Sequence, residues 1–336
     1  MPVKRGVRVF PCRLLVDLPN WLGDFVHALP ALEMLLAANA QGETTLLVPA
    51  AHVPLARKLG VAVLPRPEKA GLAFARTLPA CDVALSFRHS TRAKLLLFGL
   101  RAKVKLASSG RGAALLGLTT FAVDRSLHQR HDLDGALRLL GLPGVDGQPP
   151  RSLRQARRMV RPLRVVLLPG SHRDCRKRYP KEGFAQLAQA FARRGLEVVA
   201  VVGPSDAPLG AWLAGAGGCR LLPPTAGLAE VAGFLATVRL AIGNDTGLTH
   251  LAAAVGCPTI ALFGPTSPGR TAPSPGLALC APEFARRGWE GLPLATVLAA
   301  ASRVLAGDLH PEANVAIMKI GGGPLAQLAE QGTLNP

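Results

Sequence analysis

The segment GNDTGLTHLAAAVGCPTIALFGPTSP, which spans residues 243–268, places an acid, hydroxyls and a histidine at one turn of the chain. The apolar run before it predicts a strand over 239–244, and the spacing after it predicts a helix over 246–256. Asp245 then occupies the N-cap position. The first turn of such a helix presents backbone N–H groups and the positive end of the helix dipole, so the segment predicts an anion site.

Three further residues of this turn favour a bound diphosphate. Gly247 lets a ligand approach the backbone closely, and the hydroxyls of Thr246 and Thr249 are additional donors. The alternative is structural, with Asp245 as a simple cap and His250 as a buried histidine with internal hydrogen bonds. Because Asp245 is itself an anion, a phosphate at this turn also requires a cation beside it.

A basic loop in LLPGSHRDCRKRYP, residues 167–180, supplies such cations. It follows a predicted buried strand and precedes a helix that begins near Pro180, so it lies at the carboxyl edge of a sheet, where ligands bind. The loop therefore predicts a phosphate clamp, although a solvated run of surface charge is the alternative. It has no GxxxxGK[ST] motif and is not a P-loop. The cations are Arg173, Arg176, Lys177 and Arg178.

A carboxylate with catalytic potential lies in PNWLGDFVHALPAL, residues 19–32. Asp24 lies where the first predicted strand turns into the first predicted helix, so we expect it to face the ligand-binding edge. A carboxylate in that position can act as a general base. The alternative is again a helix cap.

These residues depend on short apolar strands that alternate with helical stretches, which is the pattern of a parallel α/β sheet. The predicted strands are 13–18, 44–49, 61–65, 82–87, 102–107, 164–170, 196–203, 219–222, 239–244 and 259–264. The alternation occurs twice, so we expect an α/β protein with two doubly wound domains whose carboxyl strand ends face a common cleft.

The predicted domains are residues 1–142 and 164–306. Residues 143–163 between them are rich in Pro, Gly and Arg and have little periodicity, so we expect a linker. Residues 307–336 lose the alternating pattern, and we expect a loose tail.

Composition limits the function classes. The six cysteines of the 336 residues have neither CxxC pairs nor metal-type spacing, which argues against a zinc site or a disulfide framework and fits a reducing compartment. No apolar segment reaches the ~18 residues of a membrane span. A net charge of +18 favours anionic partners: nucleic acid, an anionic membrane face or phosphorylated substrates. With 1 Tyr, 3 Trp and 11 Phe, few aromatics are present for base stacking, so no nucleic acid partner is expected.

Taken together, the three segments resemble the heptosyltransferases of glycosyltransferase family 9, which build the inner core of lipopolysaccharide. The resemblance covers about residues 12–305 and is most specific at DTGLTHL followed by ALFGPTSP, with NWLGD, LPAL and the PGS and KRYP elements in the expected order. It implies a GT-B fold of two Rossmann-like domains, with the acceptor on the N-terminal domain and the nucleotide sugar on the C-terminal one. It also implies an inverting transfer without a metal or another cofactor.

The resemblance also implies roles for individual residues. Asp24 is the expected catalytic base and Lys177 the expected contact to the donor phosphate. The whole expected donor-binding set is Ser171, Lys177, Arg178, Asp245, Thr246, Gly247, Leu248, Thr249 and His250. The sequence departs from the family where Tyr179 replaces the usual Trp, and the crowded RKR leaves open whether Lys177 or Arg178 supplies the cation.

The implied donor is ADP-heptose, and the implied acceptor is an anionic lipid A–Kdo molecule, so we expect a cytoplasmic protein that contacts the inner face of the inner membrane. Basic residues predicted to approach that surface are Arg88, Arg92, Lys94, Arg101, Lys103 and Lys105. Two alternatives stay open: a GT-B sugar-nucleotide epimerase, and a non-catalytic polyanion-binding protein, for example one that binds RNA. The sequence leaves the acceptor hydroxyl and the heptosyltransferase subclass undecided.

Overall fold

The computed structural model describes residues 9–110, 112–146, 148–154, 163–171, 174–308 and 315–319. The chain forms two compact units that divide between Leu153 and Arg154. The predicted linker, residues 143–163, spans this division, and residues 147 and 155–162 of it lie outside the described residues.

The first unit is an α/β unit with a six-stranded sheet in the order β3-β2-β1-β4-β5-β6, in which every pairing is parallel. The strands are β1 (Arg13–Asp17), β2 (Glu43–Pro49), β3 (Ala62–Arg66), β4 (Cys81–Ser86), β5 (Ala102–Ser108) and β6 (Thr119–Phe121). The helices are α1 (Leu22–Ala38), η1 (Ala50–His52), α2 (Val53–Ala56), η2 (Arg57–Leu59), α3 (Leu72–Thr77), α4 (Thr91–Gly99), η3 (Gln129–Leu133) and α5 (Asp134–Leu139).

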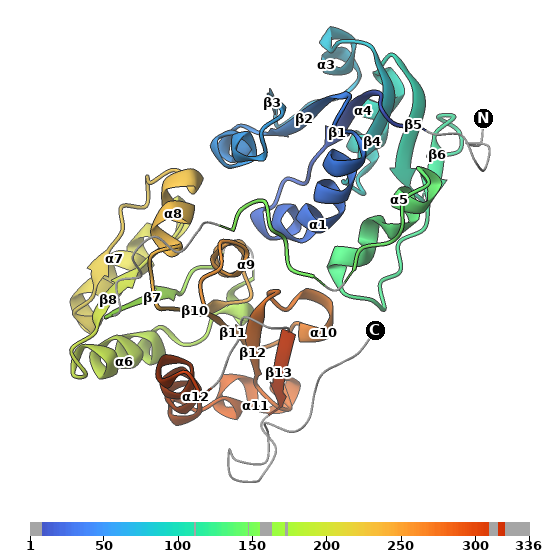
Figure 1. The fold of residues 1–336 in the computed structure, drawn as a ribbon. Coiled ribbons are helices and arrows are strands. Elements are labelled where there is room, and N and C mark those ends of the chain that lie inside the picture. Colours follow the sequence, from blue (N-terminus) through green and yellow to red (C-terminus); the bar gives the residue numbers. More distant parts are fainter. Residues whose placement is uncertain are drawn as a thin grey trace. The chain divides into compact units, whose positions relative to one another are not determined.

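The second unit has a seven-stranded parallel sheet in the order β13-β12-β11-β10-β7-β8-β9 (Figure 1). The strands are β7 (Arg164–Leu168), β8 (Glu197–Ala200), β9 (Arg220–Leu221), β10 (Leu240–Asn244), β11 (Thr259–Phe263), β12 (Gly276–Cys280) and β13 (Val315–Lys319). The helices are η4 (Cys175–Lys177), α6 (Lys181–Ala192), η5 (Pro204–Asp206), α7 (Ala207–Gly217), α8 (Leu228–Leu235), α9 (Gly247–Ala254), α10 (Pro268–Thr271), α11 (Phe284–Arg287), η6 (Gly288–Gly291) and α12 (Leu294–Ala306).

The central strands are mostly apolar, and helices cover the sheets. In the first unit, Leu15, Leu47 and Ala84 of three adjacent strands pack with residues of α3 and α4 in one buried cluster. In the second unit, Phe184 and Phe191 of α6 lie with residues of α12 against the sheet. The predicted α/β class is therefore confirmed in both units.

One part of the predicted tail is ordered. Residues 307–336 were expected to be loose, but Val315–Lys319 form β13, which pairs in parallel with β12 and extends the second sheet. Residues 309–314 and 320–336 lie outside the described residues. Among the helices that the structure describes, none combines the length and the hydrophobicity needed to cross a bilayer.

Each sheet has a point at which the strand order reverses. In the first unit, β2 lies on one side of β1 and β4 on the other; in the second unit, β8 and β10 flank β7 in the same way. The loops that leave the two central strands diverge at such a point, which leaves space for a ligand at the carboxyl edge. At the second switch point Gly243 permits close packing, because a Cβ there would lie 2.5 Å from both Leu168 Cβ and Thr249 Oγ1.

Candidate active site

The switch point of the second unit is organised around the carboxylate of Asp245, which directly follows β10 and is buried. Its Oδ2 accepts hydrogen bonds from Lys177 Nζ at 3.0 Å and from Thr266 Oγ1 at 2.8 Å. Its Oδ1 lies 3.2 Å from His250 Nε2. His250 belongs to α9, which directly follows Asp245, whereas Lys177 and Thr266 come from the loops after β7 and β11, so the carboxylate connects its own turn to two other loops.

The surroundings of Asp245 keep it ionised. Burial alone raises the pKa of this carboxyl, but the hydrogen bond and charge of His250 and the charge of Lys177 outweigh burial and lower the pKa from 3.8 to about 2. A depressed pKa means that the charge stabilises the fold fully above about pH 4, and that this stabilisation is lost as the pH falls toward 2. Near neutral pH the site therefore contains a permanent negative charge.

Lys177 and Arg178 have different partners. The sequence had left open which of the two supplies the cation of the predicted anion site. Lys177 reaches the Asp245 turn, and 29% of its side chain is exposed. Arg178 instead donates from Nη2 to the carbonyl of Ser171 at 2.7 Å and to Asp206 Oδ1 at 2.8 Å. The geometry therefore places the Lys177 ammonium, rather than the Arg178 guanidinium, at the predicted anion site.

The rest of the basic loop is fixed by local contacts. Arg176 pairs with Asp174 at 2.9 Å, and the hydroxyl of Ser171 donates to the carbonyl of Asp174 at 3.1 Å. Tyr179, which stands where the family has Trp, is buried and donates its hydroxyl to the carbonyl of Leu292 at 3.1 Å. Arg173 lies outside the described residues.

The start of α9 differs by one residue from the predicted turn. The helix begins at Gly247 with Thr246 at the N-cap, and no side-chain capping bond forms there among the described residues. The assignment of Asp245 to the N-cap was therefore wrong. Thr249 is fully buried and donates to the carbonyl of Asn244 at 2.6 Å, so its hydroxyl closes the turn instead of facing a ligand.

Half-buried positions remain at the start of this helix. Thr246, Gly247 and Leu248 are partly exposed, whereas His250 is buried against Asp245. The first N–H groups of a helix have no acceptor within it, so this end favours a negatively charged ligand group. With Lys177 beside it, the turn combines a cation and a helix N-terminus.

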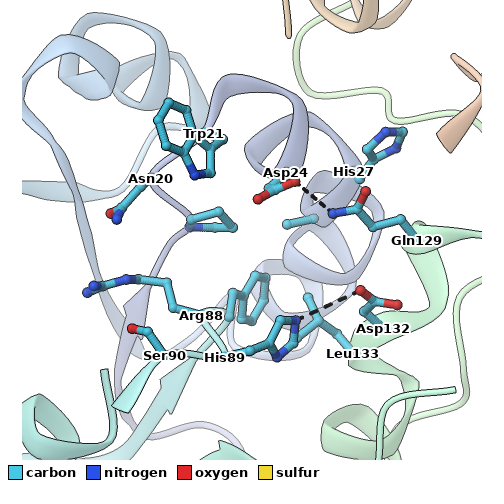
Figure 2. A pocket seen from close by; sticks show the side chains of 13 residues that line it. Asn20, Trp21, Asp24, His27, Arg88, His89, Ser90, Gln129, Asp132 and Leu133 are labelled. Atoms are coloured by element: carbon cyan, nitrogen blue, oxygen red, sulfur yellow. Dashed lines mark hydrogen bonds and ion pairs between the residues drawn. The ribbon is translucent and has the colours of Figure 1, made fainter. Parts of the chain in front are cut away.

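The first unit contains a pocket of about 180 Å³ at its own switch point. Asp24 of α1 lines it, and Gln129 Nε2 donates to Asp24 Oδ1 at 2.8 Å (Figure 2). The lining residues are Pro19, Asn20, Trp21, Asp24, His27, Ala28, Phe87, Arg88, His89, Ser90, Gln129, Asp132 and Leu133.

Asp24 is not a helix cap. The N-cap of α1 is Trp21, and Asp24 is the third residue of the helix, where its charge lies near the positive end of the dipole. The structural alternative for Asp24 was therefore wrong. The carboxylate lies in the pocket wall, and its Oδ1 accepts the hydrogen bond from Gln129.

Sequence reasoning did not identify two of these partners. Thr266 belongs to the FGPTSP turn, which directly follows an apolar strand. That position would have predicted that Thr266 lies at the carboxyl edge of the sheet. Gln129 is separated from Asp24 by 105 residues and follows no predicted strand or motif, so local sequence contains no signal for that contact.

Two parallel α/β units, each with a polar site at its switch point, define a GT-B glycosyltransferase fold. A family model described as glycosyltransferase family 9 (heptosyltransferase) matches residues 72–280, which is more than half of the chain. The protein belongs to this family, as its sequence motifs indicated. Membership favours a transferase over the epimerase and the polyanion-binding alternatives.

Among curated relatives, lipooligosaccharide heptosyltransferase 2 of Haemophilus influenzae is 34% identical over 119 residues, which is 34% of each chain. Lipopolysaccharide heptosyltransferase 1 of Pseudomonas aeruginosa is 39% identical over 97 residues, which is 28% of this chain and 27% of that protein. The matched segment thus spans about a third of these relatives.

Solved structures show the shared fold over a larger part of the chain. The structure of E. coli heptosyltransferase WaaC with ADP has a TM-score of 0.74 and 21% identity, and the match covers 87% of this chain and 99% of that one. A family 9 glycosyl transferase from Veillonella parvula also has a TM-score of 0.74, with 19% identity and coverage of 90% and 99%.

The network around Asp245 predicts unequal effects of two similar substitutions. Thr266 donates to Asp245 Oδ2 at 2.8 Å, whereas Thr271 lies at 3.5 Å from the same oxygen. A hydrogen bond to a charged group contributes about 1.5–3 kcal/mol, so we expect Thr266→Val to lower the unfolding free energy of the second unit by that amount. We expect Thr271→Val, the matched control, to lower it by less than about 1 kcal/mol.

Urea denaturation followed by tryptophan fluorescence measures this difference. In a Trp21→Phe background the remaining tryptophans, Trp212 and Trp289, both lie in the second unit and report on it alone. Equal losses of unfolding free energy in Thr266→Val and Thr271→Val would show that the shorter hydrogen bond does not stabilise the unit more than the longer one.

Proposed function

We propose that this protein transfers a heptose from ADP-heptose to a sugar hydroxyl of the lipopolysaccharide inner core, as an inverting enzyme that needs no metal. The observation that carries the proposal is Asp24, a carboxylate in the wall of a pocket with one oxygen fixed by Gln129. Family membership supports heptose as the transferred group. The names of the relatives support a lipopolysaccharide acceptor.

In the proposed reaction the pocket of the first unit takes the acceptor. The acceptor hydroxyl loses its proton to Asp24 while its oxygen forms a bond to the anomeric carbon. The bond from that carbon to the diphosphate breaks, and its electron pair leaves with ADP. Attack on the face opposite the leaving group inverts the configuration in a single displacement.

The second unit takes the donor in this proposal. The Lys177 ammonium and the N–H groups of Thr246 and Gly247 stabilise the negative charge that develops on the departing diphosphate. Lys177 is close to Asp245, so it offsets the repulsion between that carboxylate and a phosphate. Ser171, Arg178, Leu248, Thr249 and His250 support the donor site around these groups, Thr249 by closing the turn from inside.

Asp24→Asn tests the proposed base. The amide keeps the shape of the side chain and removes the proton acceptor, so we expect heptose transfer to fall by about 10²–10⁴-fold. The affinity for ADP and the melting temperature stay near those of the wild-type protein, because Asp24 lies in the first unit and does not cap its helix. Transfer from ADP-heptose to a soluble inner-core acceptor is the measurement.

A rate within a few-fold of wild type would remove Asp24 from the role of base. His27, one turn further along α1 and also in the pocket lining, would then be the next residue to test.

Lys177→Met tests the donor site separately. The loss of a charge-assisted phosphate contact costs about 1.5–3 kcal/mol, so we expect the dissociation constant for ADP to rise about tenfold or more by calorimetry. The matched control is Arg176→Met in the same loop, whose guanidinium pairs with Asp174 instead of facing the Asp245 turn. Equal ADP affinity in Lys177→Met and the wild type would remove Lys177 from the site.

We also propose that the first unit contacts the cytoplasmic face of the inner membrane through the outer side of α4. Arg92, Arg101 and Lys103 are exposed there or nearby, and Leu95 and Phe98 of α4 are exposed apolar side chains. Basic and apolar side chains on one surface suit an anionic bilayer. Of the six basic residues predicted for this surface, Arg88 and Lys94 are buried and do not belong to it, while Lys105 is half-buried beside Phe98.

Vesicle binding tests this surface. A basic residue near an anionic bilayer contributes about 1 kcal/mol, so reversing Arg92, Arg101 and Lys103 to Glu is expected to weaken binding to phosphatidylglycerol vesicles by roughly 100-fold or more. Transfer to a soluble acceptor is retained. The control reverses three exposed arginines of the second unit, Arg193, Arg220 and Arg287. Equal weakening by both triple variants would indicate nonspecific attraction by net charge.

A further inference from the structure

A cluster of three buried charged residues lies beside the pocket of the first unit. Asp17, the last residue of β1, is fully buried and pairs with Arg66 Nη1 and with Arg88 Nη1, the latter at 3.3 Å. We call Asp17, Arg66 and Arg88 the Asp17 cluster. It contains one carboxylate and two guanidinium groups, so its formal charge is one positive unit in excess.

Arg66 is committed to the interior of the unit. Besides Asp17, it donates to the carbonyl of Leu18 at 2.8 Å and to the side-chain oxygen of Asn20. The hydroxyl of Ser86 donates to Asp17 Oδ2 at 2.8 Å. The carboxylate thus has a guanidinium partner and a hydroxyl partner without any contribution from Arg88.

Arg88 differs from Arg66 because it borders the pocket. Its side chain is only 8% exposed, and it is one of the lining residues. Among the residues that the structure describes, its guanidinium donates to Asp17 alone, and at 3.3 Å this contact is long for a charged pair. A guanidinium has five donor N–H groups, so most of the donors of Arg88 remain for a ligand.

Burial and mutual repulsion make it unfavourable to keep both Arg66 and Arg88 charged beside Asp17. Burial lowers the pKa of Arg66, Asp17 opposes that shift, and the charge of Arg88 lowers the pKa further. Two cations close enough to repel each other in the interior are unfavourable unless an additional anion joins them. The α4 helix begins at Thr91 with Ser90 as its N-cap, so its positive dipole end also lies near the pocket.

The acidic residues that line the pocket contact residues other than Arg88. Asp24 is held by Gln129, and Asp132 lies 3.8 Å from His89 Nε2. In Figure 2 the guanidinium of Arg88 lies on the side of Asn20 and Ser90, whereas Gln129 and the His89–Asp132 pair lie on the other side. The pocket thus has a cationic side and a side that contains the proposed base.

We propose that Arg88 binds an anionic oxygen group of the acceptor, a carboxylate or a phosphate, and thereby directs a neighbouring hydroxyl toward Asp24. The planar guanidinium suits such a group because it can donate two parallel hydrogen bonds. The proposal rests on the proposed function in one respect, namely that this pocket takes the acceptor. Arg66, through the shared Asp17, holds the carboxylate that fixes Arg88.

Arg88→Gln in the full-length protein tests the site, with Arg76→Gln on the exposed side of α3 as the matched control. The first readout is binding of inorganic phosphate and of acetate by calorimetry, with ADP present at saturation so that the donor site is filled. We expect the wild type and Arg76→Gln to bind at least one of these anions, and Arg88→Gln to bind it about tenfold more weakly or not at all. The anion that binds more tightly identifies phosphate or carboxylate as the preferred group.

The second readout is transfer kinetics with a soluble inner-core acceptor. We expect Arg88→Gln to raise the KM for the acceptor about tenfold or more while ADP affinity is unchanged. The melting temperature is expected to stay close to that of wild type, because Asp17 keeps Arg66 and Ser86. Arg66→Met is the contrasting variant, and it is expected to lower the melting temperature strongly because the buried carboxylate loses its main cation.

Specific results would overturn the proposal. If phosphate and acetate bind equally to the wild type and to Arg88→Gln, or bind to neither, Arg88 is not an anion site. If anion binding is lost but the acceptor KM is unchanged, the site binds a free anion rather than the acceptor. If Arg88→Gln lowers the melting temperature as much as Arg66→Met, Arg88 is a structural cation. The calorimetric readout does not require heptose transfer, so failure of the proposed function would be visible separately in Asp24→Asn.

Discussion

A buried carboxylate at the end of a central strand determines how the ligand-binding edge of each unit is built. Asp17 ends β1 and Asp245 follows β10, and both side chains are withdrawn from solvent. A carboxylate in such surroundings is tolerated only with hydrogen-bond donors or cations around it. Most of those partners come from the carboxyl ends of other strands or from the loops after them, so the carboxylate connects these segments at the switch point of the sheet.

The two carboxylates are compensated differently, and the difference bears on what each unit can bind. Around Asp245 the partners are one ammonium, a histidine and two threonine hydroxyls, and the Lys177 side chain stays partly exposed. Around Asp17 two guanidinium groups face a single carboxylate. In the proposed donor site, a phosphate shares the Lys177 cation with Asp245. In the proposed acceptor site, an anionic group of the ligand balances the second positive charge of the Asp17 cluster.

The sequence predicted ten of the thirteen described strands, because a short apolar run is a local signal, whereas β6, β12 and β13 were not predicted. Apolar runs predicted the central strands, and the FGPTSP and DTGLTH turns follow two of them directly. The helix starts were less well predicted. Acidic side chains are favourable both at the N-cap and in the first turn, so the pattern does not distinguish the two positions. Asp24 proved to lie inside its helix and Asp245 before the cap.

The remaining contacts of the first site have no local signal. Gln129 reaches Asp24 across 105 residues, and Arg66 reaches Asp17 across 49, so only the folded sheet brings them together. Strand β13 was missed for a similar reason, because its apolar run becomes a strand through pairing with β12, which was itself not predicted. In the sequence, Asp17 is an acidic residue within a predicted apolar strand. In the structure it is buried, so an acid in such a strand indicates a buried charged residue rather than a surface loop.

The fold also changes what the positive charge of the chain implies about binding partners. Composition attributes a net charge of +18 to the whole molecule, which suggests a surface for long polyanions. Several of these cations are buried, however: Arg66, Arg88, Lys94, Arg130 and Arg164. A buried cation cannot contact a long polyanion along a surface, but it can bind a small anionic group that enters a pocket. In the proposals above, Lys177 and Arg88 at the two switch points bind small anionic groups of the substrates, and the exposed cations attract a charged surface more weakly.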